Sequence, residues 1–385
     1  MIGSRLALVV IILAMATAAR AQVRPAKGSW HLAREQHARS GVILDDSLAA
    51  CPGINLVVPG HAPEAFLMDH AGRVIHSWTY DGLRAFISYK PRGGPENHTY
   101  WRRAYLYPNG SLLAIYEGIG LIKLDRYSKL LWTYPGKAHH DLEVGPDGRI
   151  YVLARDEHPD PDRNRRRPIL EDCVAVLDAD GQELQRISVL EALKKSEYAG
   201  LLAQLSPHGN LLQTTTVQLL DGSQADRLPA FAAGNLLLSI LKLDMVAVLD
   251  PRAGKVVWAR QGPFKAPQAA EILDNGHLLV FDSRYQPDTA SRVVEIDPLT
   301  GEIVWDYTGS PEQPFHSTDY GANQRLPNGD TLIVESDAGR AFEVAPDRRL
   351  VWEYHTPQRG GPRQEFIATL VDVVRYPPGY VDWLP

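Results

Sequence analysis

The chain has 385 residues, of which 44% are hydrophobic and 22% are charged, with a formal net charge of −6. This composition is ordinary for a globular protein. The negative charge gives no electrostatic attraction to nucleic acid or to an anionic membrane surface, so neither is expected as a partner.

The first residues predict export. Arg5 precedes an apolar stretch, Leu6 to Ala19, and Ala19-Arg-Ala21 offers a small-residue cleavage site. We therefore expect a signal peptide over residues 1–21, cleaved after Ala21, and a periplasmic or secreted protein. The apolar stretch is too short for a comfortable membrane span. In an oxidising compartment the two cysteines, Cys51 and Cys173, either form a disulfide or are buried separately, and the sequence leaves both open.

A short pattern of turns and strands then recurs along the chain. Its copies begin at Pro108-Asn-Gly110, Asp274-Asn-Gly276 and Pro327-Asn-Gly329, and each runs through alternating apolar strands to a Trp. Asn-Gly pairs supply the positive φ that tight hairpins need. A repeat of roughly 45–50 residues built from short strands is typical of a β-propeller.

The clearest part of each repeat is an apolar strand, a turn and a second strand with an aromatic residue. These strand pairs cover 66–78, 121–132, 174–185, 246–258, 293–305 and 342–352. Gln185 stands where the third repeat should carry its Trp. We expect each Trp to pack against the neighbouring repeat rather than to bind a ligand.

These repeats predict an all-β fold, a six-bladed β-propeller with a short N-terminal arm and a small helical insertion. The expected limits are 22–50 for the arm and 51–385 for a single propeller domain. The apolar spacing within Val189 to Leu205 predicts the helical insertion. The tail, Tyr376 to Trp383, should fold back on the ring.

One polar motif stands where a propeller strand meets the channel, His139-His140-Asp141. A His followed by Asp can act as a general base, an oriented nucleophile or an anion-binding donor. A plain polar loop pair remains the alternative. The chain has no HExxH, CxxC, GxSxG, P-loop or dinucleotide-binding motif, so we expect neither a metal nor a cofactor.

Several phrases resemble the aryl-sulfate sulfotransferase (ASST, arylsulfotransferase) family. They are Cys51 to Val58, Leu67 to Trp78, His139 to Asp141, Ser291 to Asp297, Gln324 to Ile333 and Gly339-Arg340. The resemblance covers about residues 41–360. It implies an exported six-bladed propeller that moves sulfate between phenols without a nucleotide donor. In that family a channel His is transiently sulfated, and further His and Arg residues stabilise the transferred group.

The chain departs from this family at the residues that carry the chemistry. The family's nucleophile lies in a Gln-His-Asp phrase, where this chain has Gln268-Ala269-Ala270. A second His is replaced by Gln213 and an Arg by Leu241. Sulfuryl transfer needs an in-line nucleophile and fixed positive donors. We therefore expect the usual chemistry to be lost or rerouted, which leaves open whether the protein is an enzyme.

The remaining polar residues give candidates for a rerouted site. His140, and more weakly His139, are candidate catalytic residues. The candidate substrate-binding residues are Arg102, Arg103, Asp141, Lys242, His316 and Arg325. The expected partner is a small aromatic or sulfated molecule.

Two other functions compete with an altered sulfotransferase. One is a non-catalytic propeller that binds a small aromatic molecule, a glycan or another protein. The other is a quinone-dependent propeller, suggested by Asp297 to Trp305. We do not favour the quinone-dependent function, because those enzymes use more blades than this chain can supply. The sequence predicts neither the substrate nor the oligomeric state.

Overall fold

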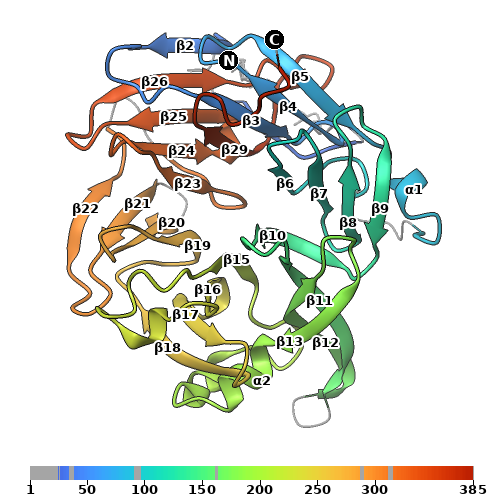
Figure 1. Cartoon of the computed structure of the whole chain (residues 1–385), viewed down its shortest axis with the longest axis vertical. Coiled ribbons are helices and arrows are strands. Elements are labelled where there is room, and N and C mark those ends of the chain that lie inside the picture. Colours follow the sequence, from blue (N-terminus) through green and yellow to red (C-terminus); the bar gives the residue numbers. More distant parts are fainter. Residues whose placement is uncertain are drawn as a thin grey trace, which may run out of the picture.

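The computed structural model describes residues 25, 27–33, 39–90, 97–160, 164–286, 290–310 and 315–384. The predicted signal peptide, residues 1–21, lies outside them. Most of the regular structure in the described residues is antiparallel β-sheet, and six sheets of four or five strands surround a common opening (Figure 1). The all-β prediction is confirmed.

The first three sheets follow the order of the chain except for one strand. The first contains β29 (Leu370–Tyr376), β3 (Ile54–Pro59), β4 (Glu64–Met68) and β5 (Val74–Thr79). The second contains β6 (Arg103–Leu106), β7 (Leu112–Tyr116), β8 (Gly120–Leu124) and β9 (Leu130–Tyr134). The third contains β10 (Ala138–Val144), β11 (Ile150–Asp160), β12 (Asn164–Leu177) and β13 (Glu183–Ser188), with β14 (Gly209–Asn210) beside β12.

The next three sheets repeat this arrangement. The fourth contains β15 (Thr214–Leu219), β16 (Leu236–Ile240), β17 (Met245–Asp250) and β18 (Lys255–Gln261). The fifth contains β19 (Pro267–Ile272), β20 (Leu278–Gln286), β21 (Ala290–Ile296) and β22 (Ile303–Tyr307). The sixth contains β23 (Ala322–Arg325), β24 (Thr331–Glu335), β25 (Arg340–Val344), β26 (Leu350–His355) and β2 (Gly41–Asp45). In each sheet the first strand named lies nearest the central opening (Figure 1).

The hairpin turns form where the sequence predicted them. Gly110 (φ 82°) and Gly329 (φ 91°) adopt the positive φ that favours glycine. The preceding asparagines cap the same turns, since Asn109 Oδ1 accepts from the Ser111 N–H and Asn328 Oδ1 accepts from the Asp330 N–H. Local chemistry therefore fixes where each strand ends and the next begins.

Hydrophobic packing fills the space between adjacent sheets. The largest such core joins the third and fourth sheets through residues such as Val174, Leu190 and Leu238, all at most 1% exposed. Another joins the sixth sheet to the first through Val57 and Trp352, both fully buried. Because each sheet is covered on both faces by its neighbours, its middle strands carry near-continuous apolar runs.

A polar contact also joins every sheet to the next. In each case a side chain on the fourth strand from the centre reaches a backbone carbonyl within the third-to-fourth-strand turn of the following sheet. The contacts are His76–Arg126 (2.8 Å), Trp132–Ala179 (3.2 Å), Gln185–Pro251 (3.3 Å), Arg260–Pro298 (3.1 Å), Trp305–Pro346 (3.0 Å) and Trp352–His70 (2.9 Å). The Gln185 amide thus makes the contact that a Trp makes elsewhere.

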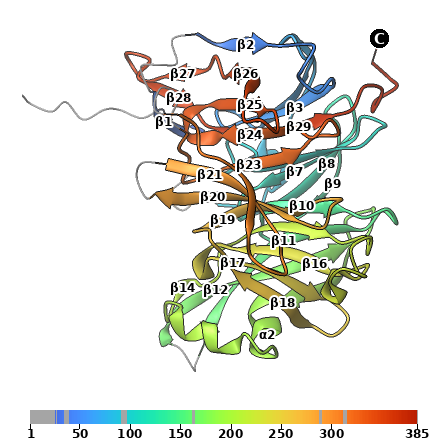
Figure 2. The ribbon, with the colours of Figure 1, turned by 90° about the vertical axis from the view of Figure 1, so that its left-hand side faces the viewer.

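Both ends of the described chain add to the ring. Strand β29 pairs with β3 and completes the first sheet from inside, while β2 pairs with β26 on the outside of the sixth. Strand β1 (Trp30–Leu32) pairs with β28 (Phe366–Ala368), which pairs with β27 (Arg359–Gly360). This small three-stranded sheet lies on one face of the ring (Figure 2).

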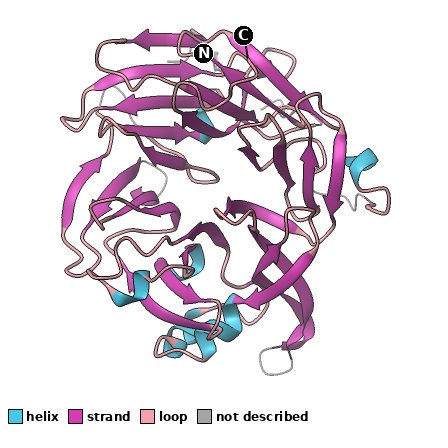
Figure 3. Cartoon of the chain, viewed as in Figure 1, coloured by secondary structure: helices cyan, strands magenta, loops and turns pink. Residues whose placement is uncertain are grey.

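The two α-helices of the described chain lie at the outer edge of the ring, while short 3-10 turns lie among the strands (Figure 3). Within the predicted helical stretch, α2 (Val189–Lys194) is followed by a 3-10 turn at Ala199–Gln204, so the insertion is helical but interrupted. A second short helix is α1 (Gly82–Ala85). None of the helices in the described residues is long and apolar enough to cross a membrane. Cys51 and Cys173 are both buried and free, so separate burial, not a disulfide, is observed.

Candidate functional site

Two adjoining cavities lie where the inner strands converge. The first, the central cavity, has a volume of about 170 Å³ and is lined by residues of all six inner strands. Its polar lining residues are Arg102, Arg103, His140, Asp141, Glu143, Thr215, Thr216, Gln218, Gln268, Glu271, Asn323 and Asp372.

The second, the mouth cavity, has a volume of about 510 Å³, which suits a small organic ligand. Its lining residues are Pro25, Gly28, Ser29, Trp30, His31, Asn97, Tyr100, Arg102, Glu117, His140, Gln213, Asp319 and Tyr320. Arg102 and His140 line both cavities, so they lie at the junction between them.

His140 reaches this junction because β10 bulges. Its φ is 51°, a left-handed conformation, and the pairing of β10 with β11 shifts between Ala138 and Leu142. Ala269 has the same conformation in the fifth sheet, with φ 44° in a bulge between Gln268 and Glu271. Both positions therefore lie in bulges of inner strands, but only His140 carries an imidazole.

The two histidines form a hydrogen-bonded pair. Their Nδ1 atoms are 2.9 Å apart, and His139 Nε2 lies 3.2 Å from the carbonyl oxygen of Ala154. A carbonyl can only accept, so His139 carries its proton on Nε2 and accepts at Nδ1. His140 then donates from Nδ1, which leaves the Nε2 of His140 with a lone pair.

Burial keeps both imidazoles neutral. Desolvation, reinforced by the nearby Arg155 guanidinium, lowers the pKa of His139 to about 3. The pKa of His140 is held well below its usual range by desolvation and by the positive charges of Arg102 and Arg155.

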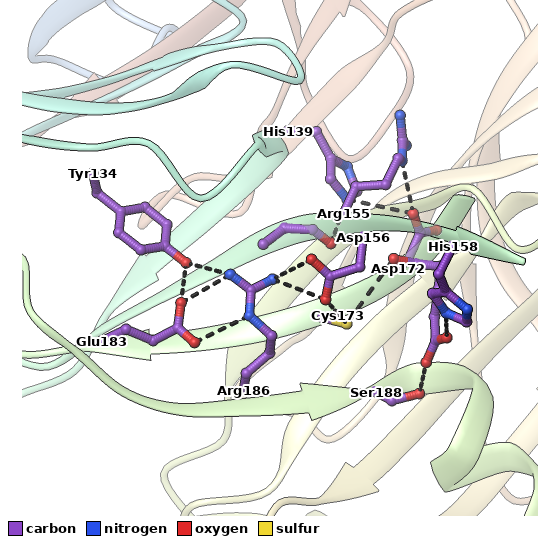
Figure 4. Close-up of polar contacts among 12 residues, drawn as sticks. Tyr134, His139, Arg155, Asp156, His158, Asp172, Cys173, Glu183, Arg186 and Ser188 are labelled. Carbon is purple, nitrogen blue, oxygen red and sulfur yellow. Dashed lines mark hydrogen bonds and ion pairs between the residues drawn. The ribbon is translucent and has the colours of Figure 1, made fainter. Parts of the chain in front are cut away.

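The buried carboxylate of Asp172 holds the Nε2 side of the His139 ring. Asp172 Oδ1 lies 3.4 Å from His139 Nε2 and accepts from Arg155 Nε at 3.1 Å (Figure 4). Asp172 Oδ2 accepts from the Thr214 N–H at 2.7 Å, which links this network to the fourth sheet. The ring of His139 is therefore held in one orientation.

Aromatic and acidic groups surround His140 on the side of the mouth cavity. Glu117 accepts from the His140 N–H at 3.0 Å, and Arg102 Nε lies 3.9 Å from the same carboxylate. The Arg102 guanidinium stacks over the ring of Tyr320 at 4.5 Å, and the Tyr320 hydroxyl contacts that of Tyr100 at 3.2 Å.

The central cavity carries more carboxylates than guanidinium groups. Arg103 lies 3.0 Å from Asp141 and also pairs with Asp372, so its charge is already balanced. Desolvation raises the pKa of Glu143 to about 7 and that of Glu271 to about 7. The cavity is thus poor in unpaired positive charge.

The other candidate residues lie outside both cavities. Lys242 is exposed on the turn between β16 and β17, beside Leu241. His316 donates its backbone N–H to Glu335, and Arg325 pairs with Glu295 at 2.7 Å. Of the positions where the resemblance predicted a replaced residue, Gln213 lines the mouth cavity and Ala269 the central cavity.

Sequence reasoning missed several residues that the fold brings to the site. Glu117 follows β7, Asp172 lies within β12, and Tyr100 and Tyr320 lie in loops far apart in the sequence. No spacing in the sequence connects these positions. They meet only because separate sheets converge on one axis.

The fold and its axial cavities define a propeller-like protein with a polar channel. A family model described as arylsulfotransferase (ASST) matches residues 109–357, which is more than half of the chain. The chain therefore belongs to the arylsulfotransferase family.

Solved structures share the fold at low sequence identity. A protein of unknown function from Bacteroides caccae is 13% identical, with 83% of this chain and 99% of that chain covered and a TM-score of 0.51. Streptogramin B lyase is 13% identical (92% and 96% covered, TM-score 0.48), and the WD40 β-propeller domain of Doa1 is 11% identical (92% and 99% covered, TM-score 0.46). No curated protein matches the chain.

Proposed function

We propose that this protein is an exported six-bladed propeller of the arylsulfotransferase type that binds a small aromatic molecule in its mouth cavity. The supporting observation is the set of groups around that cavity. Trp30, Tyr100 and Tyr320 offer aromatic surface, while Arg102 and His140 lie at its floor. Aromatic side chains favour an aromatic ligand, and a guanidinium suits a sulfate or phenolate oxygen.

The central cavity lacks most of the groups that the family's sulfated-histidine reaction would need. Ala269 stands where a nucleophilic His is expected, and two arginines face four carboxylates, those of Asp141, Glu143, Glu271 and Asp372. Sulfuryl transfer needs fixed positive donors around the moving group, and the loss of one donor can cost about 3 kcal/mol of barrier. Binding without the family's reaction is the function that this geometry supports best.

Titration calorimetry with 4-nitrophenyl sulfate and with 4-nitrophenol tests this proposal. We expect Tyr320→Leu to weaken binding at least ~10-fold, because it removes the ring that Arg102 stacks on. Tyr127→Leu is the matched control, since Tyr127 is 73% exposed and lies outside both cavities. Equal affinity in the two variants, or no binding by the native chain, would contradict an aromatic site in the mouth cavity.

Sulfuryl transfer through His140 is a second candidate, favoured by the lone pair that the hydrogen-bond chain leaves on His140 Nε2. Nε2 would attack the sulfur of an aryl sulfate, forming an N–S bond as the aryl O–S bond breaks and its electron pair leaves with the phenolate. The oxygen of a second phenol would then attack sulfur as the N–S bond breaks, its proton passing to the phenolate released in the first step and the imidazole regaining its lone pair. Arg102 would offset charge on the sulfuryl oxygens.

Mass spectrometry of protein quenched during incubation with 4-nitrophenyl sulfate tests the second candidate. A peptide that contains His140 should gain one sulfuryl group, and His140→Asn should abolish this gain together with any release of nitrophenol. Asn tolerates the left-handed backbone at this position. Turnover that survives in His140→Asn would exclude His140 as the nucleophile.

A further inference from the structure

We propose that Glu117, His139 and His140 form a binding site for a late transition-metal ion such as Zn²⁺ at the junction of the two cavities. One ligand atom from each residue lies within 4.8 Å of the other two. The two Nδ1 atoms are 2.9 Å apart, and His140 Nδ1 is 3.4 Å from Glu117 Oε1. This site goes beyond the ligand binding proposed above and does not depend on it.

The distances approach those of a metal that the three side chains share. Two nitrogens at about 2.1 Å from a tetrahedral Zn²⁺ lie about 3.4 Å apart, so the two Nδ1 atoms, 2.9 Å apart in a hydrogen bond, would have to separate by about 0.5 Å to bind it together. Because Glu117 and His140 line the mouth cavity, the remaining coordination positions would open toward it. An open position of this kind is typical of sites that bind a further ligand.

The tautomer of His139 supports the same assignment. Its Nε2–H points to the Ala154 carbonyl and to Asp172, so its Nδ1 lone pair faces His140 and Glu117. Metal-binding histidines commonly donate their other ring N–H to a carbonyl or carboxylate in this way. Asp172 is itself held by Arg155 and by the Thr214 N–H, which keeps the ring of His139 in place.

The ligand atoms, rather than the charges nearby, select the class of metal. Arg102 lies near Glu117 and Arg155 pairs with Asp172, and their positive charges oppose any cation, so a bound metal would depend on strong bonds to the two imidazoles. Mg²⁺ and Ca²⁺ prefer several carboxylate or carbonyl oxygens, whereas two imidazoles and one carboxylate suit Zn²⁺, Co²⁺ or Ni²⁺. A metal on His140 Nδ1 would leave the proton on Nε2. Metal binding and nucleophilic attack by His140 Nε2 therefore exclude each other.

Metal titration of the full chain, expressed without an affinity tag and stripped with a chelator, tests the site. We expect about one equivalent of Zn²⁺ by calorimetry, visible absorption of histidine-bound Co²⁺, and no competition from Mg²⁺. His140→Asn and Glu117→Gln should each weaken Zn²⁺ binding at least ~10-fold. Circular dichroism of each variant checks that it is folded. If His140→Asn does not fold, Glu117→Gln alone tests the site. We expect Glu117→Gln to fold, because Gln can still accept the hydrogen bond from the His140 N–H.

A histidine outside both cavities provides the control. The side chain of His158 is 45% exposed on β11. His158→Ala should leave Zn²⁺ affinity unchanged. Loss of binding in His158→Ala, or native affinity in both His140→Asn and Glu117→Gln, would overturn the proposal. Aromatic binding measured with chelator present reports on the mouth cavity separately, so the two proposals can fail independently.

Discussion

Ala269 and His140 show how a single side chain changes the chemistry of an otherwise repeated backbone. Both residues keep the left-handed conformation of a bulge beside the channel. For a residue other than glycine, this conformation costs on the order of 1 kcal/mol. The backbone feature is thus retained in the fifth sheet although the side chain there has no polar group.

Stability should depend on pH through the buried glutamates of the central cavity. Burial raises the pKa of Glu271 to about 7, although the Arg325 N–H, the Arg325 and Arg103 charges and Asn323 oppose the shift. The unfolded chain ionises near the ordinary glutamate pKa, so the folded state binds an extra proton between the two values. The free energy of unfolding should therefore fall by about 1–3 kcal/mol as pH rises from about 5 to 7.5.

Denaturant titrations across that pH range measure this effect. Glu271→Gln should flatten the curve, while Glu302→Gln, a change on an exposed turn, should leave its slope unchanged. Glu143, which faces Asp141 and Arg103, contributes in the same direction and keeps part of the slope in Glu271→Gln. An unchanged slope in Glu271→Gln would mean that its carboxyl is not protonated in the folded state.

At the scale of a single strand, the fourth strand of each sheet carries the side-chain hydrogen bond to a turn carbonyl of the next sheet. The sequence predicted that the Trp residues would pack between repeats and marked Gln185 as an exception. Gln185 nevertheless reaches the carbonyl of Pro251 at 3.3 Å, so it preserves the contact with a shorter side chain. In the fourth sheet Arg260, two residues beyond Trp258, makes the corresponding contact, so both the donor and its position vary between sheets.

Trp352 should be the most sensitive of these contacts. It is fully buried, and its Nε1–H donates to the His70 carbonyl across the boundary between the sixth and first sheets. Trp352→Phe removes this bond and part of the packing, and we expect a loss of about 2–3 kcal/mol in unfolding free energy. Trp132→Phe, at a half-buried position, should cost under ~1 kcal/mol. Equal losses of unfolding free energy in the two variants would show that the burial of the Trp does not determine the size of the loss.

At the scale of the whole molecule, the ring closes with strands from distant parts of the chain. Strand β29 brings residues 370–376 beside residues 54–59, and its Val371 and Asp372 line the central cavity. The closing strand therefore completes both the first sheet and the candidate site. Beyond it, Trp383 packs against His76, and the Tyr380 hydroxyl donates to the Leu106 carbonyl, so the tail folds back as expected.

Two truncations separate these contributions. A chain that ends at Tyr376 keeps β29 and should fold with a lower melting temperature, because only the contacts of the tail are lost. A chain that ends at Thr369 lacks β29, leaves the inner edge of β3 unpaired and should fail to form a cooperative structure. Circular dichroism and thermal melting measure both outcomes. Cooperative melting of the shorter chain would show that β29 is not needed for closure.

Much of the site could not be predicted, for a reason that His140 and Glu117 illustrate. The motif around His140 was visible because it is contiguous, and the replacement of a family His by Ala269 stays a prediction from the resemblance. Glu117, Asp172 and Tyr320 carry no local signal, and Lys242, a candidate by its position in the chain, is exposed away from both cavities. Side-chain direction depends on strand register and bulges, which the sequence alone did not indicate.

The amino-acid sequence determined the order of turns and strands, because Asn-Gly turns and alternating apolar residues act over a few positions. It also determined the family, through phrases that are contiguous along the chain. Only the tertiary structure decided which side chains share the axis, how β29 closes the ring and which charges pair in the cavity. These outcomes depend on packing between residues hundreds of positions apart, where through-space contact and burial select one arrangement.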